Sequence, residues 1–162
     1  MKIKFIFVIG LGIFIVLFWH FRIILNFSNN ILIKLKYNRE KIDIKYVIDG
    51  DSLKLKDDKR LRLIGIDCYE LSDYPRAFQQ IDGNKTKDIH DVIKLGYQAK
   101  GYLERIIDEN NGNIYLKKSS NLDVYGRILG TLYTKNGENI NKMMLKDGLC
   151  MPYVFKEKFK AK

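Results

Sequence analysis

The feature that most constrains the fold is an alternation of apolar and polar residues with a period of two. It starts at Ile42, is interrupted at Gly50, and continues after a polar turn at residues 57–59 as far as Ile66. A period of two places alternate side chains on one face of a β-strand, and short polar breaks are typical of tight turns. The pattern predicts a three-stranded meander.

The second half of the chain adds a helix and further strands. Apolar residues spaced three or four apart over residues 92–107 predict a helix that packs one face on the sheet. Two more strands are expected at 113–118 and 126–134. A short helix is expected at 141–146, with Gly148 as its C-terminal cap. This order is compatible with a five-stranded barrel of the oligonucleotide-binding (OB) type, with packed helices. The expected class is α+β, mainly β.

An apolar segment at the N-terminus predicts a membrane anchor helix. Lys2 and Lys4 precede the run, and residues 5–27 are long enough to cross a hydrocarbon core as a helix. The first alanine is Ala77, so the small residues of a usual signal-peptide cleavage site are missing. We therefore expect residues 1–27 to be an uncleaved single-pass anchor, with secretion after cleavage as the alternative. Basic residues on both sides leave the side of the membrane open.

The rest of the chain is long enough for one compact domain with its own core. Its two cysteines, Cys68 and Cys150, are too few for a disulfide-built scaffold. They would pair in an exported domain and stay reduced in the cytosol, so their state is open.

The domain is positively charged. Only three of the 29 basic residues, and none of the 19 acidic ones, lie in residues 1–27. A cationic surface favours polyanions, with nucleic acid first and acidic lipid headgroups second. A merely solvated surface is the alternative.

Acidic residues gather at the predicted strand ends. Neighbouring strands of a meander bring Asp51 and Asp67 together, and close carboxylates repel each other unless a proton or cation relieves them. A hard divalent ion such as calcium, with six to eight oxygen ligands at about 2.3–2.6 Å, would do so. Solvated turn aspartates are the alternative. Glu70, three residues after Asp67, is placed to take a proton from water.

Two arginines complete a candidate catalytic set. The forked donors of Arg62 and Arg127 would match phosphate oxygens bidentately if both converged on one place, although each alone would be an ordinary surface arginine. Water attacking a phosphodiester builds negative charge at phosphorus, which a cation and arginines stabilise. The residues therefore predict phosphodiester hydrolysis.

Ordered motifs of the chain resemble those of the staphylococcal nuclease, or thermonuclease, family. The motifs are VIDGDSLKL, RLRLIGIDCYE, LGYQAKGYL, DVYGRILGTLY and NGENINKMMLKDGL. The resemblance covers residues 43–155, which leaves 28–42 as a basic linker and 156–162 as a basic tail. It implies an OB-type barrel that hydrolyses DNA and RNA with calcium and leaves 3′-phosphates. We expect a monomer.

The resemblance also implies residue roles. The calcium ligands would be Asp51, Asp67 and the backbone carbonyl of Cys68, and the catalytic residues would be Arg62, Glu70 and Arg127. Tyr125 and Tyr153 resemble tyrosines that contact the bound nucleotide, with half-buried packing as the alternative. The family usually has threonine or alanine, then proline, where this chain has Cys68 and Tyr69; a carbonyl ligand tolerates the change.

Two other functions stay open. The first is a catalytically silent, membrane-anchored nucleic-acid-binding module, because the barrel and its charge would persist without chemistry. The second is a lipid-surface adaptor, which only the charge favours. All the polar catalytic and ligand residues are present, which favours the enzyme. The sequence does not determine the preference for DNA or RNA, or the role of the loop at 71–93.

Overall fold

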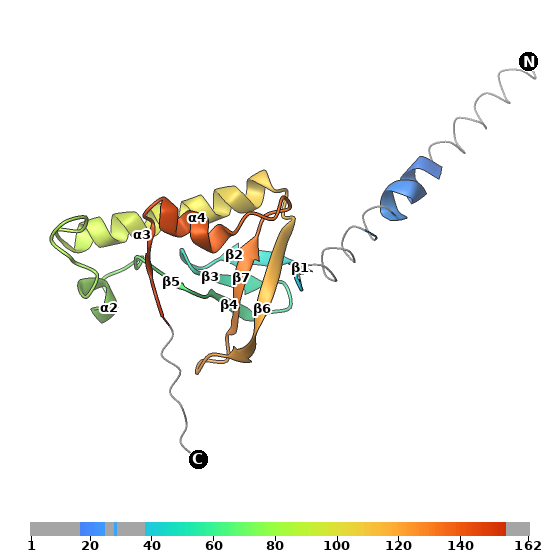
Figure 1. Ribbon diagram of the computed structural model, residues 1–162. Helices are drawn as coiled ribbons and strands as arrows, with labels where there is room; N and C mark the ends of the chain where they lie inside the picture. The colour runs from blue at the N-terminus through green and yellow to red at the C-terminus, as the bar shows by residue number, and fades with distance from the viewer. Residues whose placement is uncertain (1–16, 25–27, 29–37, 155–162) are drawn as a thin grey trace, which may run out of the picture. The chain divides into compact units, whose positions relative to one another are not determined.

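The computed structural model describes residues 17–24, residue 28 and residues 38–154 (Figure 1). The chain divides into two units, Met1–Glu40 and Lys41–Lys162. Residues 17–24 are helical, and no helix in the described residues is long and apolar enough to span a membrane. The predicted anchor helix is therefore not supported. Most of its residues, like those of the predicted linker and tail, lie outside the described ranges.

The described residues form eight strands, not the predicted five. Six make one sheet, in the order β1 (Glu40–Ile42), β6 (Ile114–Leu122), β7 (Ile128–Tyr133), β4 (Arg60–Leu63), β3 (Ser52–Leu55) and β2 (Ile44–Val47). The other two, β5 (Ile66–Cys68) and β8 (Cys150–Pro152), pair with each other.

The extra strands arise where predicted strands divide and where the chain end adds one. The predicted meander is confirmed as antiparallel β2, β3 and β4. Its third strand is not continuous to Ile66, because Gly65 has a φ of +78°, a left-handed conformation that ends β4 and lets β5 start in a new direction. The first strand divides at Asp43 into β1 and β2, and β8 was not predicted.

Residues 38–154 contain three helices, of which two were predicted. Helix α3 (Ile89–Glu109) is capped by Asp88 and buries one stripe of residues, Val92, Gly96, Ala99, Leu103 and Ile106. Helix α4 (Ile140–Lys146) begins after the Asn139 cap, and the chain turns at Gly148 with a φ of +66°. The short helix α2 (Pro75–Phe78) lies in the predicted polar loop and was missed.

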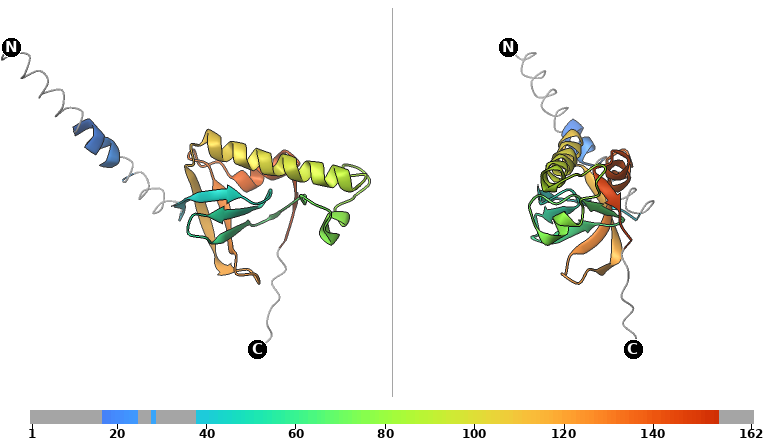
Figure 2. Two further views of the ribbon diagram at one scale, coloured as in Figure 1. Left: turned by 180° about the vertical axis from the view of Figure 1, so that it is seen from behind. Right: turned by 90° about the vertical axis from the view of Figure 1, so that its left-hand side faces the viewer.

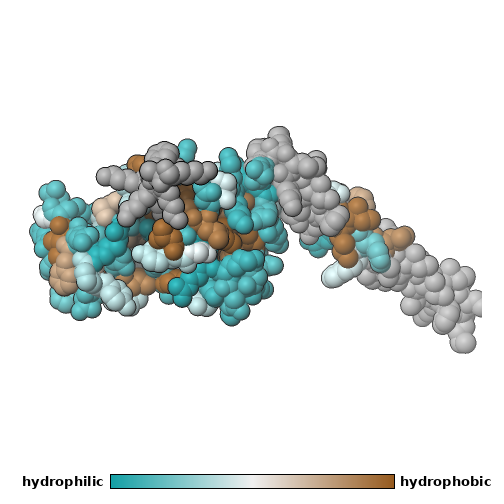
Figure 3. Space-filling model, turned by 90° about the horizontal axis from the view of Figure 1, so that it is seen from below, coloured by the Kyte–Doolittle hydropathy of each residue, from teal (hydrophilic) through white to brown (hydrophobic). Residues whose placement is uncertain are grey.

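The core lies between the helices and the concave side of the curved sheet. Figure 2 shows α3 and α4 on the same side of the strands. The least exposed large side chains include Leu53, Leu61, Leu63, Leu103, Ile114, Leu132 and Met144. On the face seen from below, hydrophilic residues dominate and hydrophobic ones gather near the middle (Figure 3). The fold is therefore an OB-like, curled half-barrel of mixed α+β type, mainly sheet.

Strand pairing brings distant parts of the sequence to one place. Strand β4 pairs antiparallel with β3, with Arg62 opposite Ser52, and parallel with β7, with Leu61 opposite Ile128. Arg62 therefore lies beside the residue after Asp51. Arg127 immediately precedes Ile128, the first residue of β7, which is opposite Leu61. These pairings position the candidate site.

Candidate active site

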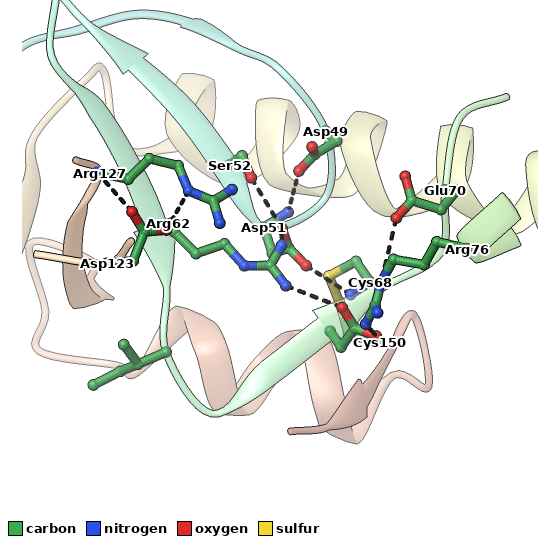
Figure 4. A network of polar contacts seen from close by, with 12 residues as sticks. Asp49, Asp51, Ser52, Arg62, Cys68, Glu70, Arg76, Asp123, Arg127 and Cys150 are labelled. Carbon is green, nitrogen blue, oxygen red and sulfur yellow. Dashed lines mark hydrogen bonds and ion pairs between the residues drawn. A yellow bond between two sulfur atoms is a disulfide. The ribbon is translucent and has the colours of Figure 1, made fainter. Parts of the chain in front are cut away.

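The centre of the site is a guanidinium between two carboxylates. Arg62 contacts Asp51 Oδ1 through Nη1 and Asp67 Oδ1, at 3.0 Å, through Nη2 (Figure 4). The Asp51 side chain is 2% exposed and that of Arg62 is 13% exposed. Burial lowers the pKa of Arg62, whereas the nearby Asp67 and Asp49 carboxylates raise it. The predicted convergence of Asp51 and Asp67 is present, with Arg62 between them.

Asp51 is fixed by further hydrogen bonds. Its Oδ2 accepts from the backbone N–H of Cys68 at 2.7 Å, and its Oδ1 accepts from the Ser52 hydroxyl at 3.1 Å. The backbone N–H of Asp51 donates to Asp49 Oδ1 at 3.0 Å. Burial raises the pKa of the Asp49 carboxyl, while Arg62 lowers it. The turn between β2 and β3 is thereby held against β5.

Glu70 lies two residues beyond the end of β5, next to Arg76 (Figure 4). Its Oε1 is 3.5 Å from Nε of Arg76, and Nη2 of Arg76 contacts Asp67 Oδ2. Burial raises the pKa of the Glu70 carboxyl, and repulsion from Asp49 adds to that rise, whereas Arg76 lowers it. A carboxylate with a raised pKa is a stronger proton acceptor, which suits a general base.

Arg127 approaches the site from the start of β7. Its Nε donates to Asp123 Oδ2 at 2.6 Å, and Asp123 Oδ1 accepts from the backbone N–H groups of Tyr125 and Arg127. Figure 4 shows the guanidinium directed toward Asp51. Its charge lowers the pKa of both Asp49 and Arg62, although burial is the largest influence on each of these groups. Arg127 therefore acts electrostatically on the same cluster.

The two predicted tyrosines have different surroundings. The Tyr125 residue is 80% exposed, and its ring centroid lies 5.3 Å from the guanidinium carbon of Arg127. Tyr153 follows β8, and its backbone N–H donates to the Gly65 carbonyl at 3.1 Å. The exposed ring beside Arg127 is available to a ligand, so half-buried packing does not describe Tyr125.

A disulfide joins Cys68 to Cys150, which are opposite each other in the β5–β8 pair. It answers a question that the sequence left open. Cys68 thus has its side chain bonded to β8 and its backbone N–H bonded to Asp51. Cys68, which directly follows Asp67, is therefore held by both its side chain and its backbone.

Whether these residues fit calcium depends on their free acceptor capacity. No group of three or more His, Cys, Asp or Glu side chains in the described residues is arranged to bind a metal. The predicted set needs only two carboxylates and a carbonyl. A carboxylate has about four lone-pair sites, and Asp67 meets two donors while Asp51 meets three. The Cys68 carbonyl accepts one bond, from Gln80. These oxygens are of the kind that a hard divalent ion prefers, but the Arg62 guanidinium lies between the two carboxylates, so an ion bound to both would have to displace it.

Four residues of the cluster were not predicted as site residues. Asp49 stands in the VIDGD motif, and Asp123 starts the DVYGR motif, so their closeness to predicted residues was a usable signal. Arg76 and Gln80 lie in a segment whose sequence has no periodicity. Nothing in the sequence placed them near Glu70.

Comparison with known families gives the classification. Residues 60–162, more than half of the chain, match the family described as "Staphylococcal nuclease homologue". The chain belongs to this family. The matched range includes Arg62, Asp67, Glu70 and Arg127, while Asp51 precedes it.

A curated relative carries an activity in its name. The chain is 27% identical over 111 residues to "Endonuclease YhcR" of Bacillus subtilis (strain 168). The match covers 66% of this chain but only 8% of the relative. This chain therefore spans only a small part of the relative's length.

Proposed function

We propose that the protein is a calcium-dependent endonuclease that hydrolyses phosphodiesters of DNA, RNA or both. The observation that carries the proposal is the linkage of Asp51 and Asp67 through Arg62, with Glu70 joined to Asp67 through Arg76. Family membership and the name of the Bacillus relative support nuclease chemistry. A phosphodiester is the substrate class for which this pairing of acids and arginines is suited.

Glu70 would accept the proton of the attacking water. Its carboxylate is partly buried, and burial raises its pKa, which strengthens it as a base. Gln at this position would keep the shape but not the proton affinity. Glu70 would therefore act as the general base in the chemical step and would not be needed to bind the substrate.

Arg62 and Arg127 would donate to the phosphate. Planar guanidiniums supply parallel donors that match two phosphate oxygens and stay charged at all working pH values. Asp123 holds Arg127 through a 2.6 Å bond to Nε, which orients the remaining nitrogens of its fork. Arg62 is held between Asp51 and Asp67 and would engage the phosphate from there.

Asp51, Asp67 and the Cys68 carbonyl would hold the calcium ion. Bound there, the ion would supply positive charge where negative charge develops at phosphorus. Oxygen ligands are those that calcium prefers. Tyr125, exposed beside Arg127, would stack on a base of the substrate. Tyr153 is proposed as a second nucleotide contact.

The positive charge of the chain supports a polyanionic partner. We also predict attachment to a membrane through residues 5–27, with secretion as the alternative. The predicted oligomeric state is a monomer.

A plasmid-digestion assay on the full chain tests the proposal. Cleavage with calcium that stops on adding chelator is the expected result. Binding of the plasmid without cleavage in calcium would contradict it and favour the silent nucleic-acid-binding module.

A further inference from the structure

The segment between β5 and α3 packs against the end of the strand that carries the site. Ala77 of α2 is fully buried and belongs to a small apolar cluster with Tyr69 and Val92. The backbone of Gly96 in α3 lies so close that a Cβ there would overlap the carbonyl of Glu70. The chain from Tyr69 to Glu70 is thus enclosed by α2 and α3.

Gln80 connects this segment to the backbone around Glu70. The residue is 5% exposed, and both ends of its carboxamide are used. Its Nε2 donates to the Cys68 carbonyl at 3.0 Å, and its Oε1 accepts from the Glu70 N–H at 2.9 Å. Burying an amide without hydrogen-bond partners is costly, so the protein is most stable in the backbone conformation in which Gln80 makes both bonds.

Gln80 is itself held by a hydrogen-bonded turn. The Thr86 hydroxyl, fully buried, donates to the Gln80 carbonyl at 2.5 Å. Asp82 Oδ1 accepts from the backbone N–H groups of Asn84, Lys85 and Thr86. The turn therefore holds the backbone of Gln80, and the side chain of Gln80 holds the backbone N–H of Glu70.

Arg76 acts on the side chain of Glu70. It is 45% exposed, contacts Asp67 Oδ2 through Nη2, and lies 3.5 Å from Glu70 Oε1 through Nε. One planar guanidinium thereby lies between the two carboxylates, hydrogen-bonded to Asp67 and within ion-pair distance of Glu70. Through Asp67 and Arg62 the chain of ion pairs continues to Asp51.

We propose that Gln80 and Arg76 are positioning residues for Glu70, with Gln80 holding its backbone and Arg76 holding its carboxylate. The two hydrogen bonds of Gln80 lie on either side of Tyr69 and restrict the backbone between Cys68 and Glu70. This assignment rests on the proposed function of Glu70.

The test compares Arg76→Ala and Gln80→Ala in the full chain with matched controls. Gln79→Ala changes the exposed neighbouring glutamine, and Arg105→Ala removes an exposed arginine of α3. Single-turnover cleavage of an oligonucleotide at saturating calcium gives the rate, and titration gives the substrate Kd. Rates are compared where circular dichroism shows each variant folded.

We expect the rate to fall about 10- to 100-fold in both variants, with little change in Kd and no change in the controls. Arg76→Lys should stay close to Arg76→Ala, because one ammonium does not reproduce the fork. The Arg76 side chain is 45% exposed, so we expect Arg76→Ala to stay folded, and a lower rate would then come from the site. Wild-type rates in both variants would overturn the assignment and leave the proposed function intact.

Amide hydrogen exchange separates this assignment from the activity. In the calcium-free protein, the Glu70 N–H should lose protection in Gln80→Ala and keep it in Gln79→Ala. Unchanged protection in Gln80→Ala would overturn the role of Gln80 even if the wild type cleaves. If the wild type does not cleave, the proposed function fails, and lost protection still supports Gln80 as the support of this backbone.

Discussion

The Asp51 carboxylate accepts a 2.7 Å hydrogen bond from the backbone N–H of Cys68, across 17 positions of sequence. The bond joins the turn before β3 to the strand that carries Asp67. Because Asp51 is 2% exposed, this bond is shielded from competition by water. The backbone next to Asp67 is thus held against Asp51, the other carboxylate of the proposed calcium site.

The Cys68–Cys150 disulfide should contribute strongly to stability. It closes a loop of 82 residues, and removing such a link should lower the free energy of unfolding by about 2–4 kcal/mol. Urea unfolding with and without reductant measures the difference. A variant with serine at both positions is the control, because reductant should not change its stability. Equal stability of the wild type in both conditions would contradict the prediction.

Asp67→Asn should weaken calcium binding, measured by titration calorimetry. The amide lacks the charge that attracts the ion, and the change also weakens the contacts of Asp67 with Arg62 and Arg76. Asp73→Asn, an exposed aspartate of the neighbouring segment, is the matched control and should bind as the wild type does. An unchanged affinity in Asp67→Asn would remove Asp67 from the ligand set.

Arg127→Lys should reduce the cleavage rate by about 10-fold or more, although the charge is kept. The lysine loses both the fork and the geometry set by the bond from Nε to Asp123. Single-turnover cleavage of a short oligonucleotide at saturating calcium gives the rate. If lysine restored nearly the full rate at both Arg62 and Arg127, the arginines would act only as part of a basic surface.

Glu70 should make stability depend on pH. Burial raises its pKa in the folded protein above the ordinary value of 4.5, so the folded state holds the proton more strongly than the unfolded chain does. The stability linked to this proton is present below the ordinary value and is lost as pH rises through the raised one. In the calcium-free protein, Glu70→Gln should therefore raise Tm at pH 7 relative to the wild type, with a smaller difference at pH 3.5. An equal difference at both pH values would contradict the shift.

The sequence predicted the parts of the fold that depend on local pattern. The alternation from Ile42 predicted the meander, and the apolar stripe at 92–107 predicted α3. The divided strand at Gly65 was missed because residues on both sides of the turn are apolar, so the alternation does not show the change of direction. Strand β8 depends on pairing with a distant strand, which period alone does not show.

The site follows the same rule. Residues within recognisable motifs, such as Asp51 and Asp67, lie where strand pairing was expected to bring them, although their roles remain predictions. Arg76 and Gln80 reach the cluster through a segment whose path is set by the burial of Ala77 and Thr86. A polar segment without periodicity does not specify that path, so only the structure could reveal their contacts.

The central claim is that this site hydrolyses phosphodiesters with Glu70 as the base, and Glu70→Gln tests it most directly. Single-turnover cleavage of an end-labelled oligonucleotide at saturating calcium is compared between wild type and variant, with the products examined for 3′-phosphates. The account predicts cleavage by the wild type and a rate about 10²–10⁴-fold lower in the variant, with oligonucleotide binding retained. Cleavage by the variant at the wild-type rate would contradict it.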